Sequence, residues 1–161
     1  MEEALAVSNQ STANSWLSKT ISRVRADSPT LIEWLGALST AVLLTLSFPN
    51  FDLFFLAWIS LVPLLLVVTR RPAPIRAFLL GWLTGSVFFY SSCYWLTYSM
   101  IHYGGLPAPI AYLLLVPGAS VVGLFPGLFA LIVSVLVRRW GYRGLAAAPF
   151  TWAACEWFRL E

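Results

Sequence analysis

The chain has 161 residues, of which 59% are hydrophobic and 11% are charged, and its formal net charge is +3. A soluble domain usually carries about 25% charged residues, so the composition excludes an ordinary soluble domain and indicates a polytopic membrane protein. No phosphate-cradling loop or basic-aromatic surface is present, so no nucleic acid partner is predicted. The two cysteines, Cys93 and Cys155, exclude a disulfide framework and fit no metal-ligand spacing. We interpret both as small buried hydrophobes, and no metal or other cofactor is expected.

Residues 1–30 form a polar N-terminal tail in which no secretory signal is recognisable. Between Ser15 and Ala26, apolar residues recur at helical spacing among Lys19, Arg23 and Arg25. This pattern fits a short helix lying on an anionic membrane surface. A disordered tail is the alternative interpretation.

Residues 31–161 are predicted to form an all-α, polytopic membrane helix bundle with about five transmembrane helices. A span needs roughly 20 apolar residues. Glu33 lies at the start of the first span, where the headgroup layer and the helix N-terminus tolerate a carboxylate. Pro63 is expected to kink the second span, and Pro109, Pro117 and Pro126 to bend or break the fourth. The predicted spans cover about 31–48, 53–69, 77–100, 106–137 and 145–160.

The region 77–137 contains no Asp, Glu, Lys or Arg and is long enough for two spans. The sequence Gly-Gly-Leu-Pro-Ala-Pro at 104–109 predicts the turn between them, because glycine frees the backbone and proline interrupts helices. Gly81 and Gly85 have the small-xxx-small spacing that lets another helix approach closely, and 123–127 offers a second such spot. Packing within the same chain is favoured over dimerisation.

Basic residues mark alternate connections of the predicted bundle, and the connections after the first and third spans contain no Lys or Arg. By the positive-inside rule, the N-terminus and the basic connections are cytoplasmic, and the turns near Asn50 and Gly104 face outward. The three basic clusters are Lys19, Arg23 and Arg25; Arg70, Arg71 and Arg76; and Arg138, Arg139 and Arg143.

Two groups of residues are candidates for contact with lipid or substrate, and no catalytic residue is assigned. Glu156 and Arg159 lie three positions apart on one helical face, which predicts either a local ion pair or a support beneath an outward-facing active site. His102, the only histidine, has no carboxylate near it in the sequence and is interpreted as a polar residue at headgroup level. The surrounding aromatic residues are interpreted as interfacial anchors that also suit contact with a lipid or an acylated substrate. They are Tyr94, Trp95, Tyr98 and Tyr103.

Several motifs follow one another in a fixed order along the chain. They are LSFPNFDL at 46–53 with LAWISLVPL at 56–64, YW at 94–95 with YSMIHYGGLPAP at 98–109, and AAPFTW at 147–152 with EWFR at 156–159. In order and spacing they resemble the N-terminal membrane domain of bacterial apolipoprotein N-acyltransferases, over about residues 43–159. The resemblance implies a multi-pass protein of the bacterial inner membrane, with membrane phospholipids as partners.

The resemblance also implies a reaction, in which an acyl chain moves from a phospholipid to the amino group of the diacylglyceryl-cysteine of an apolipoprotein. In the family, the chain is carried as a thioester on a catalytic cysteine, which belongs with a glutamate and a lysine to an extracytoplasmic nitrilase-like domain. Cys93 and Cys155 lie in no matching motif, and Lys19 is the only lysine. The chain is therefore expected to be the membrane domain, truncated before the catalytic domain and inactive alone.

Two alternative interpretations remain from the sequence. A stand-alone membrane scaffold or transporter-like subunit is favoured by the prolines within 106–137, because broken helices line transport sites. The other alternative is the same membrane module fused to a lipid-linked sugar transferase.

Overall fold

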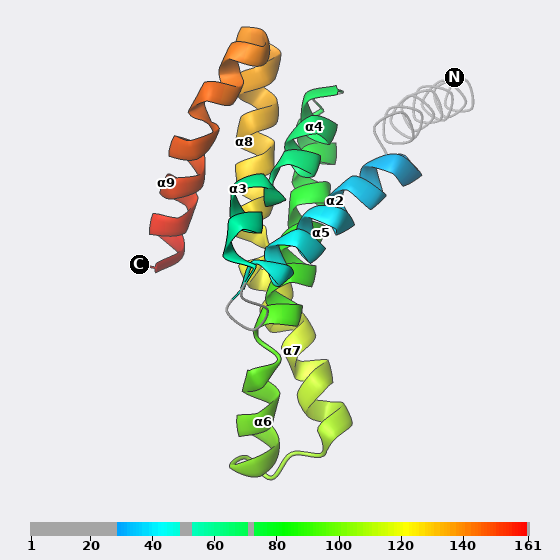
Figure 1. Ribbon diagram of the computed structural model, residues 1–161. Coiled ribbons are helices and arrows are strands. Elements are labelled where there is room, and N and C mark those ends of the chain that lie inside the picture. The colour runs from blue at the N-terminus through cyan, green and yellow to red at the C-terminus, as the bar shows by residue number, and fades with distance from the viewer. Residues whose placement is uncertain (1–28, 49–52, 71–72, 161) are drawn as a thin grey trace, which may run out of the picture.

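The computed structural model describes residues 29–48, 53–70 and 73–160, and every regular element in these ranges is helical. This confirms the all-α prediction, while the predicted N-terminal helix at 15–26 and the turn at 49–52 lie outside the described residues. The helices form an elongated bundle from which the α6–α7 hairpin projects at one end (Figure 1). In chain order the elements are α2 (Leu31–Leu46), the 3-10 helix η1 (Phe54–Leu56), α3 (Ala57–Ser60), α4 (Val62–Arg70), α5 (Pro74–Ser92), α6 (Trp95–His102), α7 (Ala108–Val122), α8 (Leu124–Trp140), the 3-10 helix η2 (Gly141–Ala147) and α9 (Ala148–Leu160).

Two fully buried threonines hold α2 against α4 and α5. The Thr40 hydroxyl accepts the backbone N–H of Leu64 at 3.0 Å, which joins α2 to α4. The Thr84 hydroxyl lies 3.0 Å from the carbonyl oxygen of Ala37 on α2 and 2.9 Å from that of Leu80 on its own helix. A buried polar group without a partner is costly in an apolar interior. These bonds therefore satisfy the threonines and fix how the three helices are rotated against one another.

The contact between α5 and α8 depends on residues that have little or no side chain. A β-carbon added to Gly81 would lie 2.5 Å from the Pro126 carbonyl oxygen and 2.7 Å from the Ala130 β-carbon. A β-carbon on Gly85 would lie 2.9 Å from the Cα atom of Gly123. Since these distances are shorter than van der Waals contact, the two backbones approach only because glycines face each other. The prediction of close packing within the chain is confirmed.

Pro63 and Pro126 lie next to interruptions of the predicted spans, whereas Pro109 lies in the first turn of α7 and Pro117 lies inside α7 without ending it. The helix that contains Pro63 is interrupted at Leu61, between α3 and α4. The predicted span at 106–137 is also two helices, α7 and α8, which meet at Gly123, and α8 continues to Trp140. Pro126 lies in the first turn of α8, where the missing N–H of proline has no intrahelical partner to lose.

The predicted span at 77–100 comprises two helices, α5 and α6, with a break between them. At the break, the N–H of Thr97 donates to the carbonyl oxygen of Tyr94 at 3.0 Å, a three-residue bond that winds the chain more tightly than an α-helix. The break follows the sequence Ser-Ser-Cys at 91–93. These small residues have weak helix preference, and serine competes for backbone hydrogen bonds.

The predicted turn at 104–109 is confirmed, since α6 ends at His102 and α7 begins at Ala108. Gly105 has a φ of 63°. This left-handed conformation favours glycine, because a β-carbon would clash with the backbone. The turn therefore depends on glycine at this position.

One helical run among the described residues, Ala108–Arg159, is long and apolar enough to cross a membrane by length and composition. It contains α7, α8, η2 and α9, and the chain reverses at η2 so that α9 returns beside α8 (Figure 1). Leu31–Leu46 and Phe54–Arg70 are shorter apolar helices. The bundle has a narrow buried core, in which Leu64, Leu80 and Phe129 are the largest side chains.

Candidate functional site

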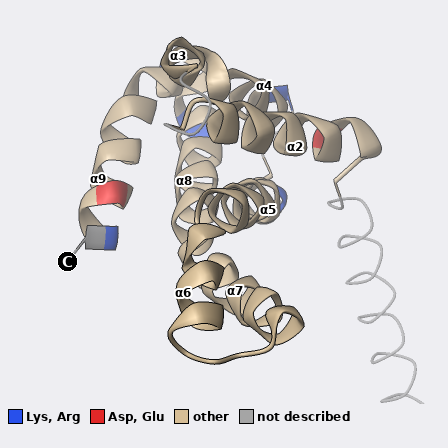
Figure 2. Cartoon of the chain, turned by 60° about the horizontal axis from the view of Figure 1, so that its bottom comes forward, with Lys and Arg blue, Asp and Glu red and all other residues tan. Residues whose placement is uncertain are grey.

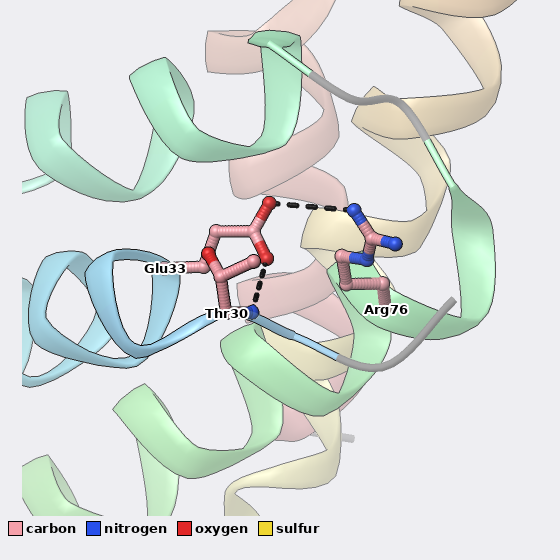
Figure 3. Close-up of polar contacts among 3 residues, drawn as sticks. All are labelled: Thr30, Glu33 and Arg76. Atoms are coloured by element: carbon pink, nitrogen blue, oxygen red, sulfur yellow. Dashed lines mark hydrogen bonds and ion pairs between the residues drawn. The ribbon is translucent and has the colours of Figure 1, made fainter. Parts of the chain in front are cut away.

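A buried ion pair joins the start of α2 to the start of α5 (Figure 3). Arg76 Nη1 lies 3.3 Å from Glu33 Oε1, and the two side chains are only 5% and 10% exposed. The other carboxylate oxygen of Glu33 accepts the backbone N–H of Thr30 at 2.6 Å, as in a capping box. The sequence did not predict this pair, since its members lie 43 residues apart and only the packing of α2 against α5 brings them together.

The Glu33–Arg76 pair has a positioning role in the bundle. Two charges in an apolar interior are tolerated only when they are paired and hydrogen-bonded. Both Glu33 oxygens have a donor, so the carboxylate is fully engaged at the junction of the two helices. The pair therefore fixes how the first turns of α2 and α5 lie against each other. It leaves neither Glu33 oxygen free to act as an acid or base.

The aromatic residues predicted as interfacial anchors gather on α6 and at its two ends. Tyr94, Trp95, Tyr98 and Tyr103 are 51%, 59%, 58% and 86% exposed. The ring of His102 stacks on that of Tyr98 with 3.9 Å between centroids, and its Nδ1 lies 3.1 Å from the Tyr98 carbonyl oxygen. In the part of the chain that the structure describes, no carboxylate hydrogen-bonds this histidine. The cluster is thus an exposed aromatic surface rather than an acid–base site.

Figure 2 shows that the hairpin bearing this surface has no charged residues on α6 or α7. The aromatic rings are its main chemical feature. Tyrosine and tryptophan rings favour the interface between hydrocarbon and water. The hairpin end is therefore suited to contact with the headgroup layer or with an amphiphile.

Glu156 and Arg159 form an ion pair on α9, so the local pairing predicted from their spacing is confirmed. Their side chains are 32% and 30% exposed. The guanidinium carbon of Arg159 lies 5.2 Å from the ring centroid of Phe89 on α5, which is cation–π geometry. Glu156 also lines, with Trp152 and residues of α2, α4, α5 and α8, a cavity of about 20 Å³, which is room for roughly one water molecule. The pair thus ties α9 to α5.

An open apolar groove of about 290 Å³ lies between α5 and α7 and was not predicted from the sequence. The indole N–H of Trp82 on α5 donates to the Ser120 carbonyl oxygen on α7 at 2.9 Å, which holds the two helices at this separation. The small side chains of Ala119 and Ser120 leave this space between the two helices. The groove is lined by Ser86, Val87, Tyr90, Val116, Ala119 and Ser120.

The two predicted groups of site residues do not lie together. The C-terminal end of α9, with Glu156 and Arg159, stands apart from α6 in both views (Figures 1 and 2). Cys93 and Cys155 are free and half-buried, which corrects the prediction that both are buried. Within the described ranges, no group of three His, Cys, Asp or Glu residues could hold a metal ion. The described residues form surfaces suited to lipid, without an assembled nucleophile and base.

Comparison with known proteins identifies the relatives of this bundle. The apolipoprotein N-acyltransferase of Geobacter metallireducens is 36% identical over 130 residues, which cover 79% of this chain and 24% of the relative. That of Coxiella burnetii is 34% identical over 125 residues, covering 76% and 26%, and that of Chromobacterium violaceum is 33% identical over 129 residues, covering 80% and 25%. The chain spans about a quarter of the length of the curated relatives it matches.

The match extends over most of the described helices. A family model described as "Apolipoprotein N-acyltransferase N-terminal domain" matches residues 40–160, from within α2 to the end of α9. The aromatic hairpin and the Glu156–Arg159 pair both lie inside the matched region. The chain therefore belongs to the apolipoprotein N-acyltransferase family.

Proposed function

We propose that the chain is the membrane domain of an apolipoprotein N-acyltransferase. The enzyme would transfer an acyl chain from a membrane phospholipid to the amino group of the N-terminal diacylglyceryl-cysteine of a lipoprotein. The observation that carries the proposal is the family match over residues 40–160. The catalytic cysteine, glutamate and lysine implied by the resemblance have no counterpart here, so the activity would require a catalytic domain in addition to these residues.

The proposed location is the bacterial inner membrane, with about five spans and a cytoplasmic N-terminus. The distribution of charge supports this topology. Arg70 and Arg76 lie where α4 ends and α5 begins, and Arg138, Arg139 and Arg143 lie around the end of α8. These helix ends lie at the end of the bundle opposite the charge-free α6–α7 hairpin (Figures 1 and 2). By the positive-inside rule, the basic end would face the cytoplasm and the hairpin would face outward.

Within this topology, two surfaces would contact lipid or substrate. The exposed rings of Tyr94, Trp95, Tyr98 and Tyr103, with His102, would lie at the outer headgroup layer, where acyl donor and lipoprotein meet. Glu156 and Arg159 would hold α9 against Phe89 beneath that layer. In this proposal the bundle positions amphiphilic substrates, and the covalent chemistry belongs to the catalytic domain.

A chimera tests the proposed function. The matched segment of the Geobacter metallireducens relative would be replaced by residues 40–160 of this chain, and acylation of a diacylated lipopeptide would be measured with phospholipid as donor. We expect turnover by the chimera and none by the 161-residue chain alone. A control chimera would carry an unrelated helical bundle of equal length. A folded chimera that is no more active than this control would refute the assignment, and turnover by the chain alone would refute the need for a further domain.

Cysteine labelling tests the topology independently of activity. After Cys93 and Cys155 are replaced by alanine, single cysteines would be introduced by Ala108→Cys, at an exposed position beside the turn, and by Arg143→Cys. An impermeant maleimide added to intact cells is expected to label position 108 but not 143, and permeabilisation should expose both. Labelling of 143 but not 108 in intact cells would mean the opposite orientation, and labelling of both would refute the proposed topology.

One observation keeps a transporter-like subunit as a second candidate. The interruptions between α5 and α6 and between α7 and α8 resemble the broken helices of transport sites. However, no charged residue lies on the chain between Arg76 and Arg138, where a polar substrate or coupling ion would need partners. Proteoliposome uptake of amino acids or ions separates the candidates, because the acyltransferase proposal expects none.

A further inference from the structure

The described residues contain more cations than carboxylates, and the carboxylates are already paired. The six described arginines face two described glutamates, and these bind Arg76 and Arg159. Arg70, Arg138, Arg139 and Arg143 thus have no carboxylate partner among the residues that the structure describes. All four lie at the same end of the bundle, so the described residues at this end carry more positive than negative charge.

Arg138 and Arg139 differ from Arg70 in what surrounds them. They line, with Val135, an open hollow of about 320 Å³ at the end of α8, and no acidic residue among those that the structure describes lines it. The hollow beside Arg70, of about 260 Å³, is also lined by Glu33. An anion near Arg70 would therefore approach a carboxylate, whereas an anion between Arg138 and Arg139 would approach no carboxylate of the described residues.

Below the two arginines, one face of α8 carries a continuous stripe of exposed apolar side chains. The stripe follows the helical spacing of four, four and three residues that keeps side chains on one face, and the next step of four reaches Arg139. The opposite face of α8 is buried against the core through Phe129 and Val133. The exposed stripe consists of Leu124, Leu128, Ile132 and Val135, which are 42%, 44%, 38% and 40% exposed.

The two arginines and the apolar stripe are arranged in the same order as the charged headgroup and the apolar chains of a lipid. From Leu124 to Arg139 the helix rises about 22 Å, which is longer than one leaflet of a hydrocarbon core of about 30 Å. Trp140 and Tyr142 are exposed beside the arginines, with aromatic rings that favour headgroup level. A soluble anion would use the arginines but not the stripe, whereas a phospholipid would use both.

We propose that Arg138 and Arg139 bind the headgroup of an anionic phospholipid whose acyl chains lie along the exposed stripe of α8. The inference rests on the membrane placement in the proposed function, and it adds a lipid site at the end of the bundle opposite the acylation surface. Two adjacent guanidinium groups match a phosphodiester and its uncompensated charge. A zwitterionic headgroup carries its own ammonium, whose repulsion by the same arginines would offset the attraction of its phosphate.

Native mass spectrometry of the purified chain in detergent, titrated with dioleoyl phosphatidylglycerol or dioleoyl phosphatidylethanolamine, measures the site. We expect tighter binding of phosphatidylglycerol by the wild type. The double substitution Arg138→Gln/Arg139→Gln should weaken that binding by about fivefold for each arginine, or about 25-fold together. Binding of phosphatidylethanolamine should be unchanged.

Two matched variants decide whether the effect belongs to this site. Arg70→Gln removes one charge from the same end of the bundle and should change phosphatidylglycerol affinity by less than about twofold. Arg138→Lys/Arg139→Lys keeps the charge and should retain most of the affinity. A loss in Arg70→Gln equal to that of a single substitution at Arg138 or Arg139, an unaffected double glutamine variant, or no rescue by lysine would each overturn the proposal.

The outcome is separable from that of the proposed function. Lipid binding is measured on the chain alone, whereas acylation is measured on the chimera with its catalytic domain. Selective phosphatidylglycerol binding with an inactive chimera would leave the lipid site standing and refute the enzyme assignment. An active chimera, with no preference of the chain for phosphatidylglycerol through Arg138 and Arg139, would support the enzyme assignment and refute the lipid site.

Discussion

The buried Glu33–Arg76 pair allows a quantitative test of what holds α2 to α5. The substitution Arg76→Met keeps the apolar bulk of the side chain but removes the guanidinium that lies 3.3 Å from the Glu33 carboxylate. At an effective dielectric constant of about 20, two unit charges at this separation attract by about 5 kcal/mol. Desolvation of both groups offsets part of this energy. Removal of one partner of a buried pair typically costs about 3–5 kcal/mol, so we expect Arg76→Met to destabilise the bundle by about 3 kcal/mol.

The assay is reversible unfolding of the purified chain from detergent micelles into SDS, followed by far-UV circular dichroism. A double-mutant cycle with Glu33→Gln isolates the pairwise energy, because other contacts of Arg76 cancel in the cycle. We expect the double variant to be more stable than the sum of the single losses predicts, with a coupling energy of about 2 kcal/mol. Removing both charges leaves neither one buried and unpaired.

The control is Arg70→Gln, which removes an exposed cation at the C-terminal end of α4, at the same end of the bundle as Arg76. Its stability should change by less than about 0.5 kcal/mol. A coupling energy within about 0.5 kcal/mol of zero would refute the reasoning, since it would mean that the pair contributes nothing beyond its separate side chains. A loss in Arg70→Gln as large as that in Arg76→Met would refute it as well.

Three further predictions concern the contacts between helices. Gly81→Ala should lower stability in the SDS titration by about 1–3 kcal/mol, because its β-carbon meets the α8 backbone. Its control, Gly118→Ala, lies at an open position of α7 and should raise stability by about 0.5 kcal/mol. Equal changes in stability for the two variants would contradict the close packing of α5 against α8. Thr84→Val should cost about 0.6 kcal/mol through its lost bond to α2, and an unchanged midpoint would argue against that bond. Trp82→Phe should increase amide hydrogen exchange at the end of α7 but not in α9, and uniform exchange would contradict a local tether.

Features that depend on residue type and local spacing were predictable from the sequence. The four-residue spacing of Gly81 and Gly85 predicted a close helix approach, and the structure provides the partner on α8. The three-residue spacing of Glu156 and Arg159 predicted their pairing on one helical face. The glycines and prolines at 104–109 predicted the hairpin turn. In each case the determining geometry lies within a few residues of chain.

Features that depend on how helices are rotated and placed against each other were not predictable. Glu33 meets Arg76 only because α2 packs against α5, and Arg159 meets Phe89 only because α9 packs against α8, beside α5. The groove between α5 and α7 is a space left by packing, so no residue pattern announces it. The break between α5 and α6 was missed because neither glycine nor proline marks it, and only the weak Ser-Ser-Cys sequence at 91–93 precedes it.

The length of the α7–α8 arm sets how far the molecule reaches. The two helices contain 15 and 17 residues, which at 1.5 Å per residue amounts to about 48 Å. A hydrocarbon core is only about 30 Å thick. With the arginines at the end of α8 anchored at one surface, the opposite tip around Gly105 would stand clear of the hydrocarbon on the far side. The aromatic rings of α6 would then lie at the interface between the hydrocarbon and the aqueous phase. A domain in the aqueous phase could contact a lipid there without entering the bilayer.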